Sequence, residues 1–223
     1  GYAAATFHTD DVEPDRHDEC RNGVHGIYDP QGTPRAGDAW GTLAAWGWGA
    51  SRALDCLETE PRIDAGRVAV VGHSRGGKAA LWCGAEDTRF ALVVSNDSGC
   101  SGAALSRRRE GETLKDINSR FPHWFCRNYR EFNGREAELP VDQHQLIALI
   151  APRLAYVASA SEDAWADPRG EFLSCRHASP VYELLGERGL EESEFPASNT
   201  PLHDGRIGYH RRSGKHDLTL SDW

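Results

Sequence analysis

Residues 68–78 read Val-Ala-Val-Val-Gly-His-Ser-Arg-Gly-Gly-Lys, a short apolar run followed by a glycine-rich turn around one serine. A G-x-S-x-G turn between a buried strand and a helix is typical of a nucleophile elbow. The turn is so tight that side chains at Gly72 and Gly76 should clash with it, and it pushes the hydroxyl of Ser74 out above the sheet. Ser74 is therefore the candidate nucleophile. The amide of Arg75 then faces the developing oxyanion at a helix N-terminus, which favours negative charge.

Strand and helix signals alternate outward from this turn. Strands are expected at residues 2–7, 67–71, 90–95, 153–159 and 207–211. Helices are expected at residues 39–58, 78–83, 141–150 and 179–187, the last with Pro180 in its first turn. Long loops are expected at residues 8–38 and 96–140. Because the strands are apolar on both sides, we predict an α/β-hydrolase fold, with a mostly parallel sheet and helices on both faces.

The length of 223 residues fits one domain with a sizeable core. We therefore expect residues 1–223 to form a single α/β-hydrolase catalytic domain. The chain has no methionine and opens inside a predicted strand. We expect it to be truncated at both ends, without the N-terminal strands of its sheet.

Composition excludes several classes of protein. The net charge of −9 argues against a nucleic-acid partner, and no apolar run approaches the length of a membrane span. None of the six cysteines forms a CxxC pair, so neither a metal site nor a cofactor is expected. Cys56 and Cys83 are predicted to be buried on helices. Cys20, Cys100 and Cys126 lie near loops, where disulfides are one alternative.

A serine nucleophile needs a base, and in this fold the chain order is serine, acid, histidine. His216 follows the last predicted strand, in a glycine-bearing loop at residues 214–217. His210 lies within that strand and His203 lies before it, so both are interpreted as surface or packed histidines. We therefore predict that His216 is the base.

Two aspartates are candidates for the acid that holds the histidine. Asp163 follows the predicted strand 153–159, and Asp97 follows the predicted strand 90–95. Either carboxylate can hold the imidazole tautomer and stabilise the imidazolium. The residues leave the choice between them open.

A set of short motifs carries a family resemblance. Besides the elbow, they are Ser-Asn-Asp-Ser-Gly-Cys-Ser-Gly (95–102), Phe-Pro-His-Trp-Phe-Cys (121–126), Leu-Pro-Val-Asp-Gln-His (139–144), Glu-Asp-Ala-Trp (162–165) and Gly-Lys-His-Asp-Leu-Thr (214–219). Together the motifs resemble the glucuronoyl esterases, carbohydrate esterase family fifteen, over nearly the whole chain. The fungal branch has a cysteine just before the serine. Because His73 stands there, the chain resembles the bacterial branch.

The resemblance implies an activity and a set of partners. Members cleave the ester that joins a 4-O-methyl-glucuronic acid of xylan to an alcohol of lignin, through an acyl-enzyme. The expected protein is then a monomer, secreted or periplasmic, with a carbohydrate ester as its substrate. An acetyl-xylan esterase or a general carboxylesterase is the alternative, and a non-catalytic carbohydrate-binding relative is a further one.

The resemblance also implies roles for individual residues. Ser74 matches the family's nucleophile and His216 its base. Arg75 matches an arginine whose side chain assists the oxyanion hole. The positions that bind the glucuronoyl sugar are matched by Lys78, Glu112 and Trp165. The family's acid is often a glutamate at the position of Asp97, and some bacterial members use an aspartate at the position of Asp163.

Overall fold

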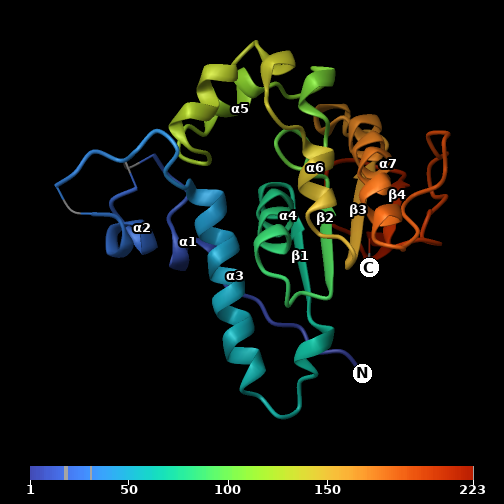
Figure 1. Cartoon of the computed structure of the whole chain (residues 1–223), viewed down its shortest axis with the longest axis horizontal. Coiled ribbons are helices and arrows are strands. Elements are labelled where there is room, and N and C mark those ends of the chain that lie inside the picture. Colours follow the sequence, from blue (N-terminus) through green and yellow to red (C-terminus); the bar gives the residue numbers. More distant parts are fainter. Residues whose placement is uncertain (18–19, 31, 223) are drawn as a thin grey trace.

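The computed structural model describes residues 1–17, 20–30 and 32–222 (Figure 1). A parallel sheet of four strands in the order β1-β2-β3-β4 lies at its centre. The strands are β1 (Ala69–His73), β2 (Leu92–Asn96), β3 (Leu154–Ala160) and β4 (Ile207–Arg212). Each strand pairs with the one before it in the chain, so the carboxyl ends of all four lie along one edge of the sheet. The predicted parallel α/β architecture is confirmed.

Helices precede the sheet and connect its strands. They are α1 (Thr9–Val12), α2 (Gly23–Tyr28), α3 (Thr42–Glu58), α4 (Arg75–Glu86), α5 (Leu114–Arg120), α6 (Gln143–Ala148) and α7 (Pro168–Leu184). Short 3-10 turns lie at Ala65–Arg67, Ser106–Arg108, Arg127–Phe132, Glu136–Glu138, Ala164–Ala166 and Leu220–Asp222. Apart from residues 2–7 and the start of α7, the predicted strands and helices lie within a few residues of the observed ones. The predicted loops at 8–38 and 96–140 are wrong in part, because they contain α1, α2 and α5, which are too short to show a helical period.

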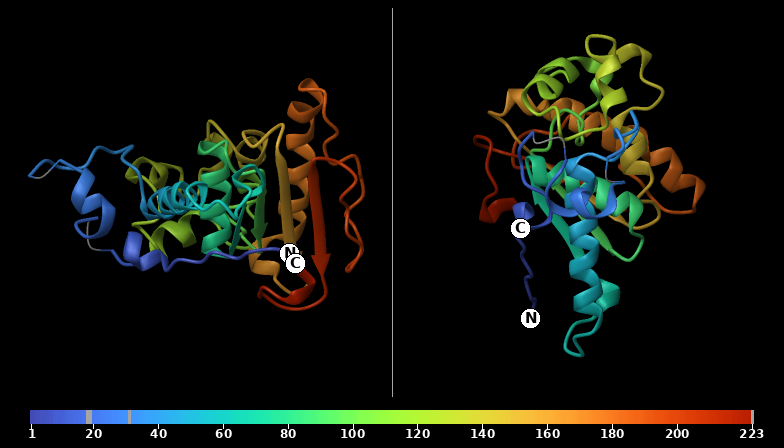
Figure 2. Two further views of the ribbon diagram at one scale, coloured as in Figure 1. Left: turned by 90° about the horizontal axis from the view of Figure 1, so that it is seen from below. Right: turned by 90° about the vertical axis from the view of Figure 1, so that its left-hand side faces the viewer.

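The main hydrophobic core lies between one face of the sheet and the helices that follow β1 and β3. Val93 and Val157 of the sheet pack there with Leu81 of α4 and Phe172 of α7. Figure 2 (right) shows these helices on one side of the strands, with the N-terminal segment and the C-terminal loop on the other. On the second face, Tyr156 and its neighbour Val94 on β2 are only partly buried. Helical cover on both faces was expected, and among the described residues it is found on one.

Two predicted elements differ from the structure. Residues 2–7 form an exposed segment that pairs with no strand of the sheet, so the predicted strand is wrong. Helix α7 begins at Pro168, where the side chain of Asp167 accepts a hydrogen bond from the amide of Gly170 at 3.0 Å. Pro180 therefore lies inside the helix and not in its first turn. The Asp-Pro pair at 167–168 is the true start signal, since aspartate caps a helix and proline suits its first position.

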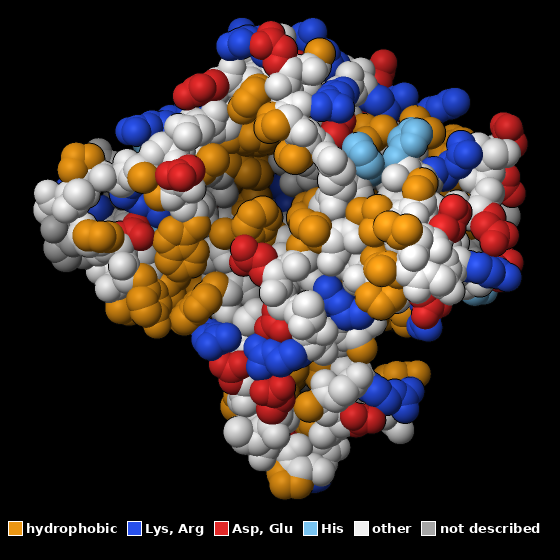
Figure 3. Space-filling model, in the orientation of Figure 1, with side chains coloured by type: hydrophobic (Ala, Val, Ile, Leu, Met, Phe, Trp, Pro, Cys, Tyr) orange, Lys and Arg blue, Asp and Glu red, His pale blue; other side chains and the backbone are white. Residues whose placement is uncertain are grey.

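The long segment between β2 and α6, residues 97–142, forms an arch that carries α5 (Figure 1). Helix α5 begins in a capping box, in which Thr113 and Asp116 each accept the other's backbone N–H. On the face shown in Figure 3, the surface is hollowed between this arch and α3, and hydrophobic side chains gather in the hollow.

All six cysteines lie within the described residues, and none is joined to another in a disulfide. Cys83 is buried on α4 as predicted, whereas Cys56 is exposed on α3, so that prediction is wrong. Among the described residues, no helix is both long enough and apolar enough to cross a membrane.

Candidate active site

The backbone of the elbow departs from ordinary strand and helix geometry at Ser74. Its φ of 55° and ψ of −121° place a non-glycine residue in a sparsely populated region, between β1 and α4. The amide of Ser74 donates to the carbonyl of Asn96 at 2.8 Å, which ties the turn to β2. A Cβ on Gly72 would lie 2.0 Å from the carbonyl oxygen of Gly76, but one on Gly76 would meet nothing within 4 Å. The predicted clash is therefore real at Gly72 and wrong at Gly76.

His216 lies next to this turn, on the loop after β4. Its Nδ1 is 2.6 Å from Oδ2 of Asp163, which comes from the end of β3. The hydrogen bond to Asp163 raises the pKa of His216 above its ordinary value, against the opposing effect of burial. The ring of His216 also packs on that of His73, with centroids 4.6 Å apart. The base candidate is thus held by an acid on one side and by the elbow on the other.

The second acid candidate, Asp97, lies in the same cluster. Ligand atoms of Asp97, Asp163 and His216 all lie within 4.8 Å of one another. Asp97 is 2% exposed, and burial raises its pKa to about 6. Its Oδ2 accepts hydrogen bonds from Arg212 and from the amide of Asp217, both at 3.2 Å. In the structure, then, Asp163 is the hydrogen-bond partner of the imidazole, and Asp97 is bonded to the loop that carries it.

Arg212 at the end of β4 was missed by the sequence analysis. It is 5% exposed, and its guanidinium donates to Asp97, to both carboxylate oxygens of Asp222 and to the carbonyls of Lys215 and Asp217. The two carbonyls flank His216 on either side. Arg212 therefore positions the histidine loop. Its place in the sequence, four residues before His216, gives no sign of these contacts.

Asp15 in the loop between α1 and α2 is a second residue that the sequence analysis missed. Its carboxylate accepts hydrogen bonds from the guanidinium of Arg75, from Nε2 of His123 at 2.9 Å and from Nε1 of Trp124 at 2.7 Å. Hydrogen bonds from Trp124, His123 and Arg75 outweigh burial and lower the pKa of Asp15. The guanidinium also lies over the Trp124 ring, 4.9 Å from its centroid. Arg75 is therefore anchored beside Ser74, the candidate nucleophile.

The three predicted sugar-binding residues lie together, with Glu112 on the arch itself, Lys78 on α4 and Trp165 after β3. The ammonium of Lys78 is 3.9 Å from the carboxylate of Glu112, and the amide of Glu112 donates to the carbonyl of Trp165 at 2.9 Å. Trp165 is 50% exposed, so one of its faces is open to a ligand. Lys78 is 6% exposed and donates to the carbonyls of Ser98 and Cys100, both at 2.5 Å. It therefore holds the start of the arch in place.

A buried glutamate on α7 is hydrogen-bonded to the segments that carry Asp97 and Asp163. Glu171 of α7 is fully buried, and burial raises its pKa to about 8. It accepts hydrogen bonds from the hydroxyls of Ser98 and Ser159 and from the amide of Gly99. These contacts join the ends of β2 and β3, which carry Asp97 and Asp163. The sequence of α7 gives no sign of this role for Glu171, because its contacts with the ends of β2 and β3 form only when the helix packs on the sheet.

Comparison with known families gives this geometry a context. The family model described as glucuronyl esterase of fungi matches residues 1–186, which is more than half of the chain. The chain belongs to the glucuronoyl esterase family. The predicted family resemblance is thereby confirmed.

The chain is similar to a prokaryotic carbohydrate esterase and to 4-O-methyl-glucuronoyl methylesterases. A protein named carbohydrate esterase MZ0003, from an unknown prokaryotic organism, is 52% identical over 225 residues, covering 100% of this chain and 51% of the relative. The 4-O-methyl-glucuronoyl methylesterase 1 of Wolfiporia cocos is 33% identical over 195 residues, covering 83% of this chain and 47% of the relative. The higher identity to the prokaryotic protein agrees with the bacterial-type resemblance that His73 indicated.

The structural neighbours are glucuronoyl esterases as well. The glucuronoyl esterase from Solibacter usitatus superposes with a TM-score of 0.91 at 48% identity, covering 97% of this chain and 55% of that one. The α/β-hydrolase fold predicted from the elbow is confirmed by this likeness. The chain spans about half the length of the curated relatives it matches.

Proposed function

We propose that the protein hydrolyses esters of glucuronic acid and of 4-O-methyl-glucuronic acid, such as the ester links between glucuronoxylan and lignin. The observation that carries the proposal is the pair His216–Asp163, bonded at 2.6 Å beside the strained Ser74 of the elbow. Membership of the glucuronoyl esterase family supports glucuronic acid as the acid part of the ester substrate. The name of the Wolfiporia cocos relative supports the methyl ester of the 4-O-methylated sugar as a substrate class.

The proposed chemistry passes through an acyl-enzyme. His216 takes the proton of the Ser74 hydroxyl as the oxygen attacks the ester carbonyl, and Asp163 stabilises the imidazolium that forms. The amide and guanidinium of Arg75 donate to the oxyanion. The imidazolium then protonates the leaving alcohol, and the uronic acid stays bound to Ser74 as an ester. Water, deprotonated by His216, attacks that ester and releases the acid and the free serine.

The sugar is proposed to lie against Trp165 and Glu112, beside the nucleophile. A pyranose presents an apolar face to an indole and hydroxyls to a carboxylate, and the half-exposed Trp165 suits the first contact. The two carbonyl contacts of Lys78 occupy two of its three N–H donors, which leaves one for Glu112 or for a sugar hydroxyl. We propose a monomeric protein that is secreted or periplasmic, where such polymers are found.

Trp165→Ala tests the substrate class. We expect KM for benzyl glucuronate to rise about tenfold with little change in kcat, because a stacking contact made equally in ground and transition states affects KM alone. Hydrolysis of nitrophenyl acetate, which has no sugar, should change little. Steady-state kinetics of the intact protein on both esters measures this.

Trp82→Ala is the matched control, since Trp82 is also an exposed tryptophan, on the outer side of α4. It should leave both reactions unchanged. Equal losses on the two esters in Trp165→Ala would argue against a sugar contact. A wild-type preference for acetylated xylo-oligosaccharides over glucuronate esters would replace the proposal with an acetyl-xylan esterase.

Arg75→Ala tests the oxyanion role. A donor that acts on the developing charge should matter more in the transition state, so kcat should fall by roughly 10²–10³ with little change in KM. Asp15→Asn keeps Arg75 but weakens its anchor, so a smaller fall in kcat is expected. An unchanged kcat in Arg75→Ala would remove the arginine from the mechanism. A rise in KM alone would make it a substrate-binding residue instead.

A further inference from the structure

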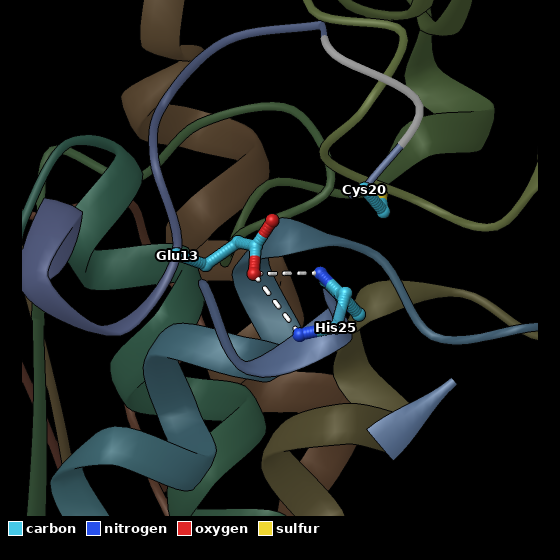
Figure 4. Close-up of side chains that lie close together, drawn as sticks. All are labelled: Glu13, Cys20 and His25. Atoms are coloured by element: carbon cyan, nitrogen blue, oxygen red, sulfur yellow. Dashed lines mark hydrogen bonds and ion pairs between the residues drawn. The ribbon is translucent and has the colours of Figure 1, made fainter. Parts of the chain in front are cut away.

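Glu13, Cys20 and His25 form a buried cluster around α1 and α2, apart from the site described above (Figure 4). One ligand atom from each residue lies within 4.8 Å of the others. Nδ1 of His25 is 3.0 Å from Oε2 of Glu13, which also accepts the amide of His25 at 3.2 Å. The three residues are respectively 1%, 8% and 0% exposed. Carboxylate, thiol and imidazole therefore meet at one point with almost no access to water.

The imidazole of His25 is poorly satisfied by hydrogen bonds. Among the residues that the structure describes, neither ring nitrogen has a hydrogen-bond partner of good geometry, although the side chain is fully buried. The edge of the ring packs against the indole of Trp40, with centroids 4.3 Å apart. Burying polar nitrogens without well-aligned partners costs free energy, so a ligand bound by the imidazole would stabilise this arrangement.

The donor atoms of the cluster indicate which ligand suits it. A carboxylate oxygen, a sulfur and an imidazole nitrogen lie within 4.8 Å of one another, on side chains that are almost fully buried. A metal cation is the ligand that all three kinds of atom can bind at once.

We propose that Glu13, Cys20 and His25 bind a zinc ion. Thiolate, imidazole and carboxylate are all donors that zinc binds in proteins, and a fourth ligand would complete its tetrahedral coordination. Tetrahedral zinc with bonds of about 2.0–2.3 Å holds neighbouring donors roughly 3.3–3.7 Å apart. The ligand atoms of the cluster already lie within 4.8 Å of one another, so a bound ion would draw them slightly closer. The residues are seven and five positions apart, which matches no regular motif, and this is why the sequence analysis predicted no metal site.

The ion would have a structural task. Glu13 lies two residues before Asp15, the anchor of Arg75, and its carbonyl accepts Nε1 of Trp46 in α3 at 2.8 Å. A metal that joins Glu13 to α2 therefore holds the segment that positions Arg75. Since metal ligands from separate segments close loops, the ion stabilises this region against unfolding.

The test is metal analysis and cobalt substitution of the intact protein, purified without a metal-affinity tag. About one zinc per chain is expected by mass spectrometry of the metal content. Replacing it with Co²⁺ should give a thiolate-to-cobalt charge-transfer absorption that saturates at one equivalent. Cys20→Ser, which keeps the size of the side chain, should abolish that absorption and lower the bound zinc by at least tenfold.

Cys56→Ser is the matched control, because Cys56 is an exposed cysteine on α3, outside the cluster. It should keep both the zinc and the cobalt absorption. The proposal is overturned if the wild-type protein takes up no cobalt with thiolate absorption, or if Cys20→Ser retains that absorption. Because the readout is metal content and spectrum, the result does not depend on the proposed esterase activity.

Discussion

Replacing Ser74 with alanine should reduce the hydrolysis of glucuronate esters by roughly 10⁴–10⁶ in kcat, with the fold intact. The serine sits in a strained conformation at the junction of β1 and α4, as a nucleophile on a tight turn does. Without the hydroxyl no acyl-enzyme can form, and only binding and oxyanion donors are left to accelerate attack by water. Steady-state kinetics on benzyl glucuronate and circular dichroism of the intact variant measure the two parts of the prediction.

A serine-directed phosphonate supplies a second readout for Ser74. It should label the wild-type protein once, at Ser74, and leave Ser74→Ala unlabelled. Ser119→Ala is the control, since Ser119 is an exposed serine on α5. This variant should be labelled at Ser74 and should hydrolyse the ester as the wild-type protein does. Near-normal turnover in Ser74→Ala, with label on another serine, would move the active site elsewhere.

Asp163→Asn should lower kcat by roughly 10³–10⁴, and Asp97→Asn by clearly less. The reason is the 2.6 Å hydrogen bond from His216 to Asp163, which sets the tautomer of the imidazole and stabilises its protonated form. Asp97 instead accepts its hydrogen bonds from Arg212 and the amide of Asp217. Its loss should therefore disturb the position of the histidine loop more than the charge on the ring. The opposite order of effects would make Asp97 the acid.

The pH dependence gives the same assignment an independent test. His216 acts as a base only when neutral, so activity should rise as the pH passes upward through its pKa. Asp163 is the principal group that raises this pKa, by its hydrogen bond. Asp163→Asn should therefore move the acidic limb of the kcat/KM profile to lower pH, whereas Asp97→Asn should move it less. A limb that moves only in Asp97→Asn would contradict the assignment.

Much of the fold could be predicted because its signals are local. An apolar run at β1, a glycine at 72 and small residues after Ser74 specify a strand, a tight turn and a helix within a dozen positions, and a Cβ at Gly72 has no room. The alternation of apolar strands with helices specified a parallel sheet. Residues 2–7 were predicted wrongly because their apolar run resembles a strand, but a strand also needs a neighbouring strand, which a local pattern does not reveal.

The sequence by itself determined the nucleophile candidate, the order of serine, acid and histidine, and the family to which the chain belongs. Only the tertiary structure decided which acid meets His216, because Asp163 and His216 are 53 residues apart and both aspartates follow strands of the same sheet. It also brought Asp15 to Arg75 across 60 residues, and Arg212 to the loop of His216. The physical reason is that strain and periodicity act between near neighbours in the chain. Hydrogen bonds and ion pairs depend on distances of a few ångströms, which the packing of the sheet sets.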